Sequence, residues 1–306
     1  MDYGEFVNRR VFLKIGTLSL AGLGTVCPQS LAVEPIERTG PARLQLSLAA
    51  YSFRQYFAKS STKPLTMFQF IDFCAQHGCV GTELTSYYFP KDLTDEYLLN
   101  IRKHAFLRGI SISGTAVGNT FTHRPGPERT EQIDMVKLWI DRAAVMGAPH
   151  IRIFAGRVEQ GMSLAEAKKL CIEAIEECAD YAGKKGIFLG IENHGGIVAE
   201  AGDILDIVRS VNSPWVGINL DTGNFHSEDP YADLAACAPF AVNVQVKVEI
   251  HRKGQTKAEP TDLSRIVQLL RNANYQGYVA LEYEAKPDPW IQVPLWLKRM
   301  REAFSE

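Results

Sequence analysis

Four short hydrophobic segments in the second half of the chain each carry an oxygen-bearing side chain at or near their carboxyl end. These side chains are Glu192 in FLGIENH, Asp221 in VGINLDTGN, Gln245 in VNVQVKVEI and Glu282 in VALEYE. Carboxylate and amide oxygens predict one bound divalent ion, Mn²⁺ or Mg²⁺ with Zn²⁺ or Co²⁺ as alternatives, rather than a thiolate zinc site. Such an ion polarises a substrate carbonyl or hydroxyl and stabilises an enediolate. Glu192 and Glu282, on opposite sides of that substrate, are then the candidates that move a proton off and onto carbon.

The spacing of these four residues fits a repeating βα architecture. Successive members lie 29, 24 and 37 positions apart, close to the ~30 residues per unit of an eightfold βα barrel, which carries its chemistry at the carboxyl ends of its strands. Around Gln245, strand alternation places Lys247 and Glu249 on the same face as Gln245 and the valines on the opposite, outward face. Inward polar groups are costly unless they are paired or bound to an ion, so a cluster of them calls for a cation.

Eight hydrophobic, β-rich segments alternate with helical patterns along the chain. The predicted strands are Leu44–Tyr51, Cys79–Leu84, Ile110–Val117, His150–Phe154, Ile187–Glu192, Val216–Asp221, Val242–Glu249 and Tyr278–Tyr283. The predicted helices are Thr66–Gln76, Asp95–Leu107, Glu128–Met146, Leu164–Lys185, Asp203–Val211, Tyr231–Ala236, Asp262–Ala273 and Trp290–Ala303. Gly78 and Gly147 each follow a predicted helix and precede a strand, as carboxyl-terminal caps do. These alternations predict an α/β protein, a single-domain (β/α)8 TIM barrel over residues 44–306, rather than an open doubly wound sheet.

The amino-terminal residues have the pattern of an export signal rather than of the fold. Residues 8–14, NRRVFLK, resemble the twin-arginine signal, and the apolar run Ile15–Val26 is shorter than the about 20 residues that a membrane span needs. The small residues of Ser30–Ala32 suit cleavage after Ala32. We therefore expect a signal segment at residues 1–32, a linker at residues 33–43 and a periplasmic or otherwise exported mature protein with no stable membrane span. The alternative is a retained amino-terminal anchor, or a basic and apolar start without a targeting role.

The composition argues against a nucleic-acid partner. The formal net charge is −2 and the sequence pI is near 6.4, and no long run of Lys and Arg occurs, so the electrostatic footprint of nucleic-acid binding is absent. The expected partner is a small-molecule carbohydrate or polyol, and the sequence is compatible with a homo-oligomer. Five cysteines follow the predicted signal without a CxxC pair and are predicted to be buried rather than disulfide-bonded or zinc-bound: Cys74, Cys79, Cys171, Cys178 and Cys237.

The motifs around the candidate residues resemble those of the xylose isomerase-like TIM barrels, which include sugar phosphate isomerases and epimerases. The resemblance extends from about Leu44 to Phe304 and rests on the motifs IENHG at 191–195, NLDTGN at 219–224, VK at 246–247 and LE at 281–282. It implies that Glu192, Asp221 and Glu282 hold one divalent ion and that the two glutamates are the acid/base pair.

The chain departs from the family pattern at two positions. Gln245 stands where the family commonly has a ligand histidine, and Asn224 stands where a histidine often follows the aspartate. Gln245 either coordinates through its amide oxygen or leaves an ion that binds more weakly or is lost. Asn224 removes a group that could contact the substrate or relay a proton.

Four further side chains are candidates for substrate binding: His194, Lys247, Glu83 and Tyr51. His194 and Glu83 would contact sugar hydroxyls, and Lys247 would hold a substrate oxygen or neutralise the carboxylates. The ring of Tyr51 would pack on the C–H face of a sugar. Each has a structural alternative in packing or a salt bridge. For Glu192 and Glu282 themselves, the alternative is a structural salt bridge with Lys247 or Arg152.

The sequence thus favours a metal-dependent sugar or polyol isomerase or epimerase that transfers a proton through an enediolate, at a carbon next to a carbonyl. A phosphorylated sugar is disfavoured because no phosphate-cradling glycine-rich loop is evident. Two alternatives stay open. One is a lyase or dehydratase that acts on a keto-sugar or keto-glycoside with the same ion. The other is a non-catalytic carbohydrate-binding barrel, which the residues at positions 224 and 245 would explain.

Overall fold

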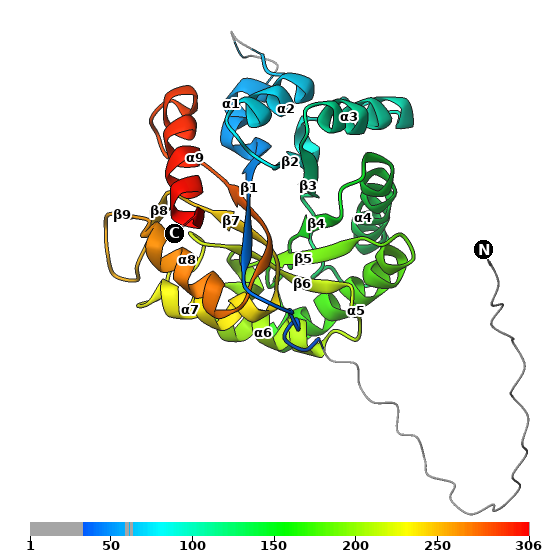
Figure 1. Cartoon of the computed structure of the whole chain (residues 1–306). Helices are drawn as coiled ribbons and strands as arrows, with labels where there is room; N and C mark the ends of the chain where they lie inside the picture. Colours follow the sequence, from blue (N-terminus) through cyan, green and yellow to red (C-terminus); the bar gives the residue numbers. More distant parts are fainter. Residues whose placement is uncertain (1–32, 59–60, 62–63, 306) are drawn as a thin grey trace, which may run out of the picture. The chain divides into compact units, whose positions relative to one another are not determined.

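Eight parallel strands form the centre of the part of the chain that the computed structural model describes, residues 33–58, 61 and 64–305. The strands are β1 (Arg43–Ala49), β2 (Gly81–Thr85), β3 (Ser111–Ala116), β4 (His150–Ile153), β5 (Phe188–Glu192), β6 (Val216–Asp221), β7 (Ala241–Val246) and β10 (Gln276–Leu281). Hydrogen-bonded neighbours follow the order β1-β10-β7-β6-β5-β4-β3-β2, and β1 also pairs with β2, so the sheet closes into a barrel (Figure 1). The predicted single-domain (β/α)8 barrel is confirmed, and each predicted strand overlaps an observed one.

Helices surround the barrel on its outer side (Figure 1). They are α1 (Arg54–Phe57), α2 (Met67–Gln76), α3 (Asp95–Leu107), α4 (Pro127–Met146), α5 (Leu164–Gly183), α6 (Ala201–Ser210), α7 (Pro230–Cys237), α8 (Leu263–Asn272) and α9 (Pro289–Ser305). Short 3-10 helices are η1 (Ala50–Phe53), η2 (Ser86–Tyr88), η3 (Gly196–Val198) and η4 (Ala238–Phe240). Capping residues fix the ends of two helices. At the start of α5, the Ser163 side chain accepts a hydrogen bond from the backbone N–H of Glu166. At the end of α4, Gly147 adopts a φ of 80°, which favours glycine.

Strand β7 ends earlier than predicted, at Val246 instead of Glu249. Beyond it, β8 (Glu249–Ile250) pairs antiparallel with β9 (Glu259–Pro260) and forms a hairpin. The physical reason lies at Lys247, whose backbone N–H donates to the Thr222 side chain and whose carbonyl accepts from the Thr261 side chain. Side chains rather than a neighbouring strand satisfy this peptide, so the chain turns out of the barrel at Lys247.

The barrel interior is polar where many barrels are filled by branched aliphatic side chains. The Ser47 and Ser113 hydroxyls lie 2.8 Å apart inside it, and Asn243 donates both to Glu83 and to Asn219, at 2.9 and 2.8 Å. The predicted alternation in β7 is correct: Val244 and Val246 belong to the hydrophobic core, while Asn243 and Gln245, which alternate with them, take part in this inner network. The interior therefore fixes the strands by directional hydrogen bonds as well as by packing.

The expected signal at residues 1–32 lies outside the described residues and stays a prediction. The segment expected as a linker contacts the barrel, because the backbone N–H of Ile36 donates to the carbonyl of Pro239 and the Arg38 side chain donates to Ala241. Within residues 33–305, less the four undescribed positions between 58 and 64, no helix is long and apolar enough to cross a membrane. The five cysteines named above are buried and unpaired with one another, as predicted.

A buried charge cluster as the candidate active site

The four predicted ligand positions lie at the same end of the barrel. Glu192 and Asp221 are the last residues of β5 and β6, Gln245 is the penultimate residue of β7, and Glu282 follows β10 directly. The register of β6 and β7 places Asp221 beside Gln245. All four residues are buried, with relative exposures of 0 to 5% for the whole residue. The barrel therefore brings together the four residues predicted from the sequence, and the chemical role of each depends on what its side chain contacts.

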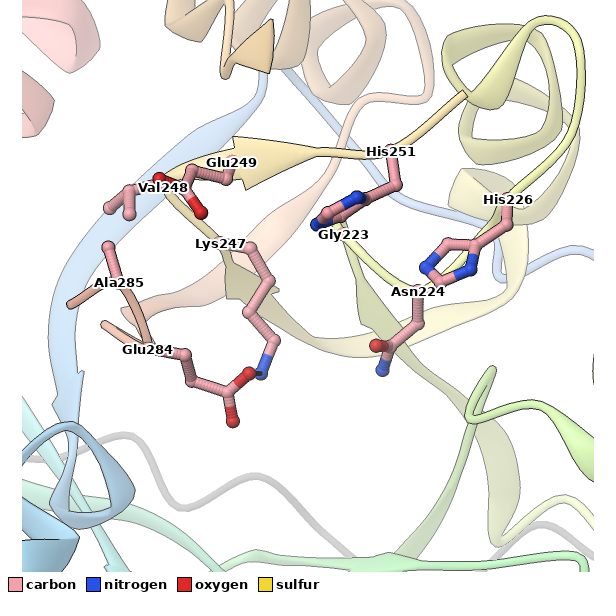
Figure 2. A pocket seen from close by; sticks show the side chains of 9 residues that line it. All are labelled: Gly223, Asn224, His226, Lys247, Val248, Glu249, His251, Glu284 and Ala285. Atoms are coloured by element: carbon pink, nitrogen blue, oxygen red, sulfur yellow. Dashed lines mark ion pairs between the residues drawn. The ribbon is translucent and has the colours of Figure 1, made fainter. Parts of the chain in front are cut away.

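Lys247 lies among the carboxylates. Its ammonium forms an ion pair with Glu282 and lies 3.3 Å from Oδ2 of Asp221 and 3.1 Å from Oε2 of Glu284. Figure 2 shows the Lys247 and Glu284 side chains meeting at the edge of a cavity. Burial lowers the pKa of Lys247, but the carboxylates around it raise that pKa well above its usual value. The ammonium is therefore charged at neutral pH and neutralises part of the cluster.

Glu192 is held from two sides. Nε of Arg152 lies 2.8 Å from its Oε2, and the Asn224 amide donates to its Oε1 at 2.9 Å. The same arginine donates to the carbonyl of Val117 at 2.6 Å and lies over the Phe154 ring. The salt-bridge alternatives for both glutamates are thus present, Glu192 with Arg152 and Glu282 with Lys247. Asn224, where the family often has histidine, serves here to orient Glu192.

The two glutamates differ in their protonation chemistry. Burial raises the pKa of Glu192, an effect that Arg152 opposes and the negative charge of Glu282 supports. Burial would also raise the pKa of Glu282, but the charge and hydrogen bond of the Lys247 ammonium lower it below its usual value. Displacement of two carboxyl pKa values in opposite directions is the arrangement that separates an acid from a base.

Gln245 points into the polar interior network. Its amide oxygen accepts a hydrogen bond from Asn219 and its amide nitrogen donates to Glu83, each at 2.6 Å. Glu83 is 1% exposed, and its pKa is raised to about 7 by burial and by the charge of Glu282, with Gln245 and Asn243 opposing the rise. Glu83 therefore lies among the inner side chains, and its predicted contact with a sugar hydroxyl stays a prediction.

The side chains present do not fit the expected divalent ion in their observed arrangement. Lys247 contacts Asp221 and Glu282, Arg152 holds Glu192, and the amide oxygen of Gln245 is hydrogen-bonded to a neighbour. Among the residues that the structure describes, no group of three or more His, Cys, Asp or Glu side chains is arranged to hold a metal ion. The carboxylates of the cluster are instead paired with two basic side chains of the protein itself, Arg152 and Lys247.

A cavity of about 270 Å³ opens beside Lys247 (Figure 2). Its lining consists of Gly223, Asn224, His226, Lys247, Val248, Glu249, His251, Glu284 and Ala285. The lining is mostly polar, and the rings of His226 and His251 lie 5.4 Å apart at one side of it. Asn224 and His226 also border a second hollow, which His194 lines. A small polar molecule in the first cavity would contact Lys247 and Glu284 at the edge of the carboxylate cluster.

The remaining predicted substrate contacts lie around the same mouth. His194 is exposed, and its ring lies 4.6 Å from that of Phe154. The Tyr51 ring is partly buried, and burial together with the charge of Glu284 raises its pKa. These positions are compatible with substrate contact, which stays a prediction for both residues.

A family model described as "xylose isomerase-like TIM barrel" matches residues 71–300. The chain belongs to the xylose isomerase-like TIM barrel family. A putative hydroxypyruvate isomerase of Mus musculus is 24% identical over 169 residues, 51% of this chain and 61% of that protein. The chain therefore spans about three fifths of the length of this curated relative.

Solved structures of the same fold include two sugar epimerases. A D-psicose 3-epimerase has a TM-score of 0.66 and 18% identity, with 85% of this chain and 97% of the other covered. A 3-keto-D-glucoside 4-epimerase of E. coli has a TM-score of 0.65 and 14% identity, with 85% of this chain and 100% of the other covered. At these identities, the likeness shows that the fold of this family member is the one those epimerases use.

Proposed function

We propose that this family member is a sugar or polyol isomerase or epimerase that moves a proton at a carbon next to a carbonyl. One arrangement carries the proposal: Glu192 and Glu282 are buried in the same cluster, each against a different basic side chain, Arg152 and Lys247. Their pKa values are accordingly displaced in opposite directions. A carboxyl with a raised pKa supplies a proton, and one with a lowered pKa is ionised and accepts one.

Each charged group then has a defined role. Glu282 accepts the proton from the substrate carbon, and the electron pair of that C–H bond moves to the carbonyl oxygen to give an enediolate. The Lys247 ammonium stabilises the negative oxygen, as preorganised donors do in a water-poor site. Glu192 returns a proton to the same carbon from the opposite face, and the enediolate oxygen becomes the carbonyl again, which gives the epimer. For the isomer, Glu192 protonates the former carbonyl carbon while the hydroxyl proton on the other carbon moves to the former carbonyl oxygen, so that a new carbonyl forms there. Glu282 then loses its proton to solvent and Glu192 regains one. Arg152 and Asn224 hold Glu192 in position to return the proton.

The lining of the cavity supports an uncharged carbohydrate as substrate. Glu249 and Glu284 bring negative charge to its walls, and Lys247, the basic residue of its lining, is already paired with carboxylates. A phosphorylated or carboxylated sugar would meet repulsion there, whereas hydroxyl groups could bond to Asn224 and to the two histidines. The likeness to sugar epimerases supports the same substrate class. The twin-arginine pattern supports the further proposal that the mature protein is exported to the periplasm.

The divalent ion that the family resemblance implies would compete with Lys247 and Arg152 for the same carboxylates. Mn²⁺ or Mg²⁺ bound to Glu192, Asp221 and Glu282 would require Lys247 to leave its present contacts. The roles given above to the two glutamates do not depend on that ion.

The test is proton exchange in D₂O. The purified protein is mixed with a panel of ketoses and keto-glycosides, and the substrate C–H signals are followed by NMR. Epimerisation or isomerisation incorporates deuterium without loss of a substituent, whereas a lyase or dehydratase releases water or an aglycone. Glu282→Gln should lower the rate by roughly 10²–10⁴-fold, while Glu131→Gln, on the exposed side of α4, should not change it. Absence of exchange across the panel would argue for the binding-protein alternative.

A further inference from the structure

We infer that the Lys247 ammonium is the resident cation of the carboxylate cluster and takes the position that a divalent ion would otherwise hold. This role of Lys247 concerns the charges in the site and does not depend on the proposed reaction. Three features support it: the hydrogen bonds that fix the lysine backbone, the ion pairs of its ammonium, and the hydrogen bonds that engage Gln245.

The backbone of Lys247 is fixed on both sides. Its N–H donates to the Thr222 hydroxyl at 2.9 Å, and its carbonyl accepts from the Thr261 hydroxyl at 2.7 Å. Gly223 gives the side chain its room, because a Cβ at that position would lie 2.5 Å from Cγ of Lys247 and 2.7 Å from its Cβ. The direction of the lysine is thus set by neighbouring residues and not only by attraction to the carboxylates.

The ammonium lies where buried carboxylates require a positive charge. Oδ2 of Asp221 is completely buried and accepts no hydrogen bond, and its ion pair is with Lys247 at 3.3 Å. Lys247 also pairs with Glu282, whose side chain is 7% exposed. A buried carboxylate without a cation is strongly unfavourable. One ammonium therefore joins two of the three carboxylates that the ion was expected to bridge.

The fourth predicted ligand, Gln245, is already engaged in hydrogen bonds. Both ends of the Gln245 amide are engaged, its oxygen with Asn219 and its nitrogen with Glu83. Release of that oxygen would leave the Asn219 amide without its acceptor in the buried interior. The three carboxylates are already paired with Lys247 and Arg152, so in the wild type they leave few free oxygens for a divalent ion.

Metal content tests the inference on the full-length protein. The wild type and Lys247→Met, in which an uncharged side chain of similar length replaces the lysine, are incubated with excess Mn²⁺, desalted and analysed by mass spectrometry for bound metal. The melting temperature of each protein is also measured in EDTA and in Mn²⁺. Lys253→Met, at an exposed position nearby, is the matched control.

We expect the wild type and Lys253→Met to retain less than about one tenth of an equivalent of Mn²⁺, with a melting temperature that the metal does not change. Lys247→Met should retain about one equivalent, and Mn²⁺ at roughly 100 times its Kd should raise its melting temperature by about 5 °C. Stoichiometric Mn²⁺ in the wild type would overturn the inference, and so would its absence from a folded Lys247→Met. If Lys247→Met does not fold, the wild-type measurement still decides the question. Because no outcome relies on turnover, failure of this inference is distinct from failure of the proposed reaction.

Discussion

Nε of Arg152 lies 2.8 Å from Oε2 of Glu192, and both side chains are at most 5% exposed. The pair joins the end of β4 to the end of β5 and orients a glutamate that the sequence singled out. Since each charge is buried, each depends on the other for its stability. Glu192, which we assign to proton transfer, is therefore also part of a structural contact, and a substitution in this pair should affect stability as well as activity.

Arg152→Met should lower the free energy of unfolding by about 3–5 kcal/mol, because the substitution leaves Glu192 buried without its cation. Urea denaturation measures the loss, with Arg102→Met on the exposed face of α3 as the control. The double variant Arg152→Met/Glu192→Leu, which lacks both charges, should recover much of it. A double variant no more stable than Arg152→Met would show that the packing of the guanidinium, rather than its charge, is what matters.

His150 should make the protein sensitive to acid. Its ring is buried, both ring nitrogens lack a hydrogen-bond partner, and burial together with the charge of Arg152 lowers its pKa to about 3. Below the unfolded-state pKa of about 6.5, the unfolded chain binds a proton that the folded protein does not. Stability should therefore fall as the pH falls from there toward the folded pKa.

His150→Leu removes this proton uptake. Between about pH 7.5 and about pH 4.5, the wild type should lose roughly 2–3 kcal/mol more unfolding free energy than the variant. Urea titrations at the two pH values give the difference, and His251→Leu at the exposed mouth should keep the wild-type dependence. Equal losses in the wild type and His150→Leu would mean that this histidine is protonated in the folded state.

Glu192→Gln should separate proton removal from proton return. Glu282 can still remove the substrate proton and exchange it with solvent, so deuterium should enter the substrate while epimerisation falls by roughly 10²–10⁴-fold. NMR in D₂O measures both rates in one sample. If exchange and epimerisation fell together, the two glutamates would not have the separate roles given to them here.

Gln245→Leu should destabilise the barrel by about 1–3 kcal/mol, because the side-chain amide of Asn219 and one carboxyl oxygen of Glu83 would lose their buried partner. Gln268→Leu, on the exposed side of α8, is the matched control, and thermal unfolding is the measurement. A neutral result would indicate that water or a neighbouring amide takes over both hydrogen bonds.

The sequence is sufficient to predict the barrel and the position of the candidate residues at or near the ends of its strands. Alternation of short hydrophobic runs with helical patterns predicts the eight strands, and position at a strand end brings Glu192, Asp221 and Glu282 together. Both depend on local periodicity, which a single sequence displays directly. The spacing also placed Gln245 and Lys247 on the inner face of β7.

The contacts across the barrel could not be predicted in the same way. Gln245 bonds to Glu83, 162 positions away on a strand that is not its neighbour, and no local pattern encodes such a pair. From the sequence, Arg152 is only one of two possible salt-bridge partners, and Asn224 is only a position that lacks the family's histidine. The hydrogen bond from Asn224 to Glu192 depends on the conformation of the turn after β6, which no local sequence pattern specifies.

The hairpin of β8 and β9 begins two residues after the ammonium-bearing lysine, and Glu249 and His251 form one wall of the cavity. The carbonyl of Lys247 is tied to Thr261, immediately beyond the hairpin. A ligand that contacts Glu249 or His251 would therefore contact the same short segment of chain that carries the Lys247 ammonium. Any shift of this hairpin on binding would change the position of the positive charge among the carboxylates.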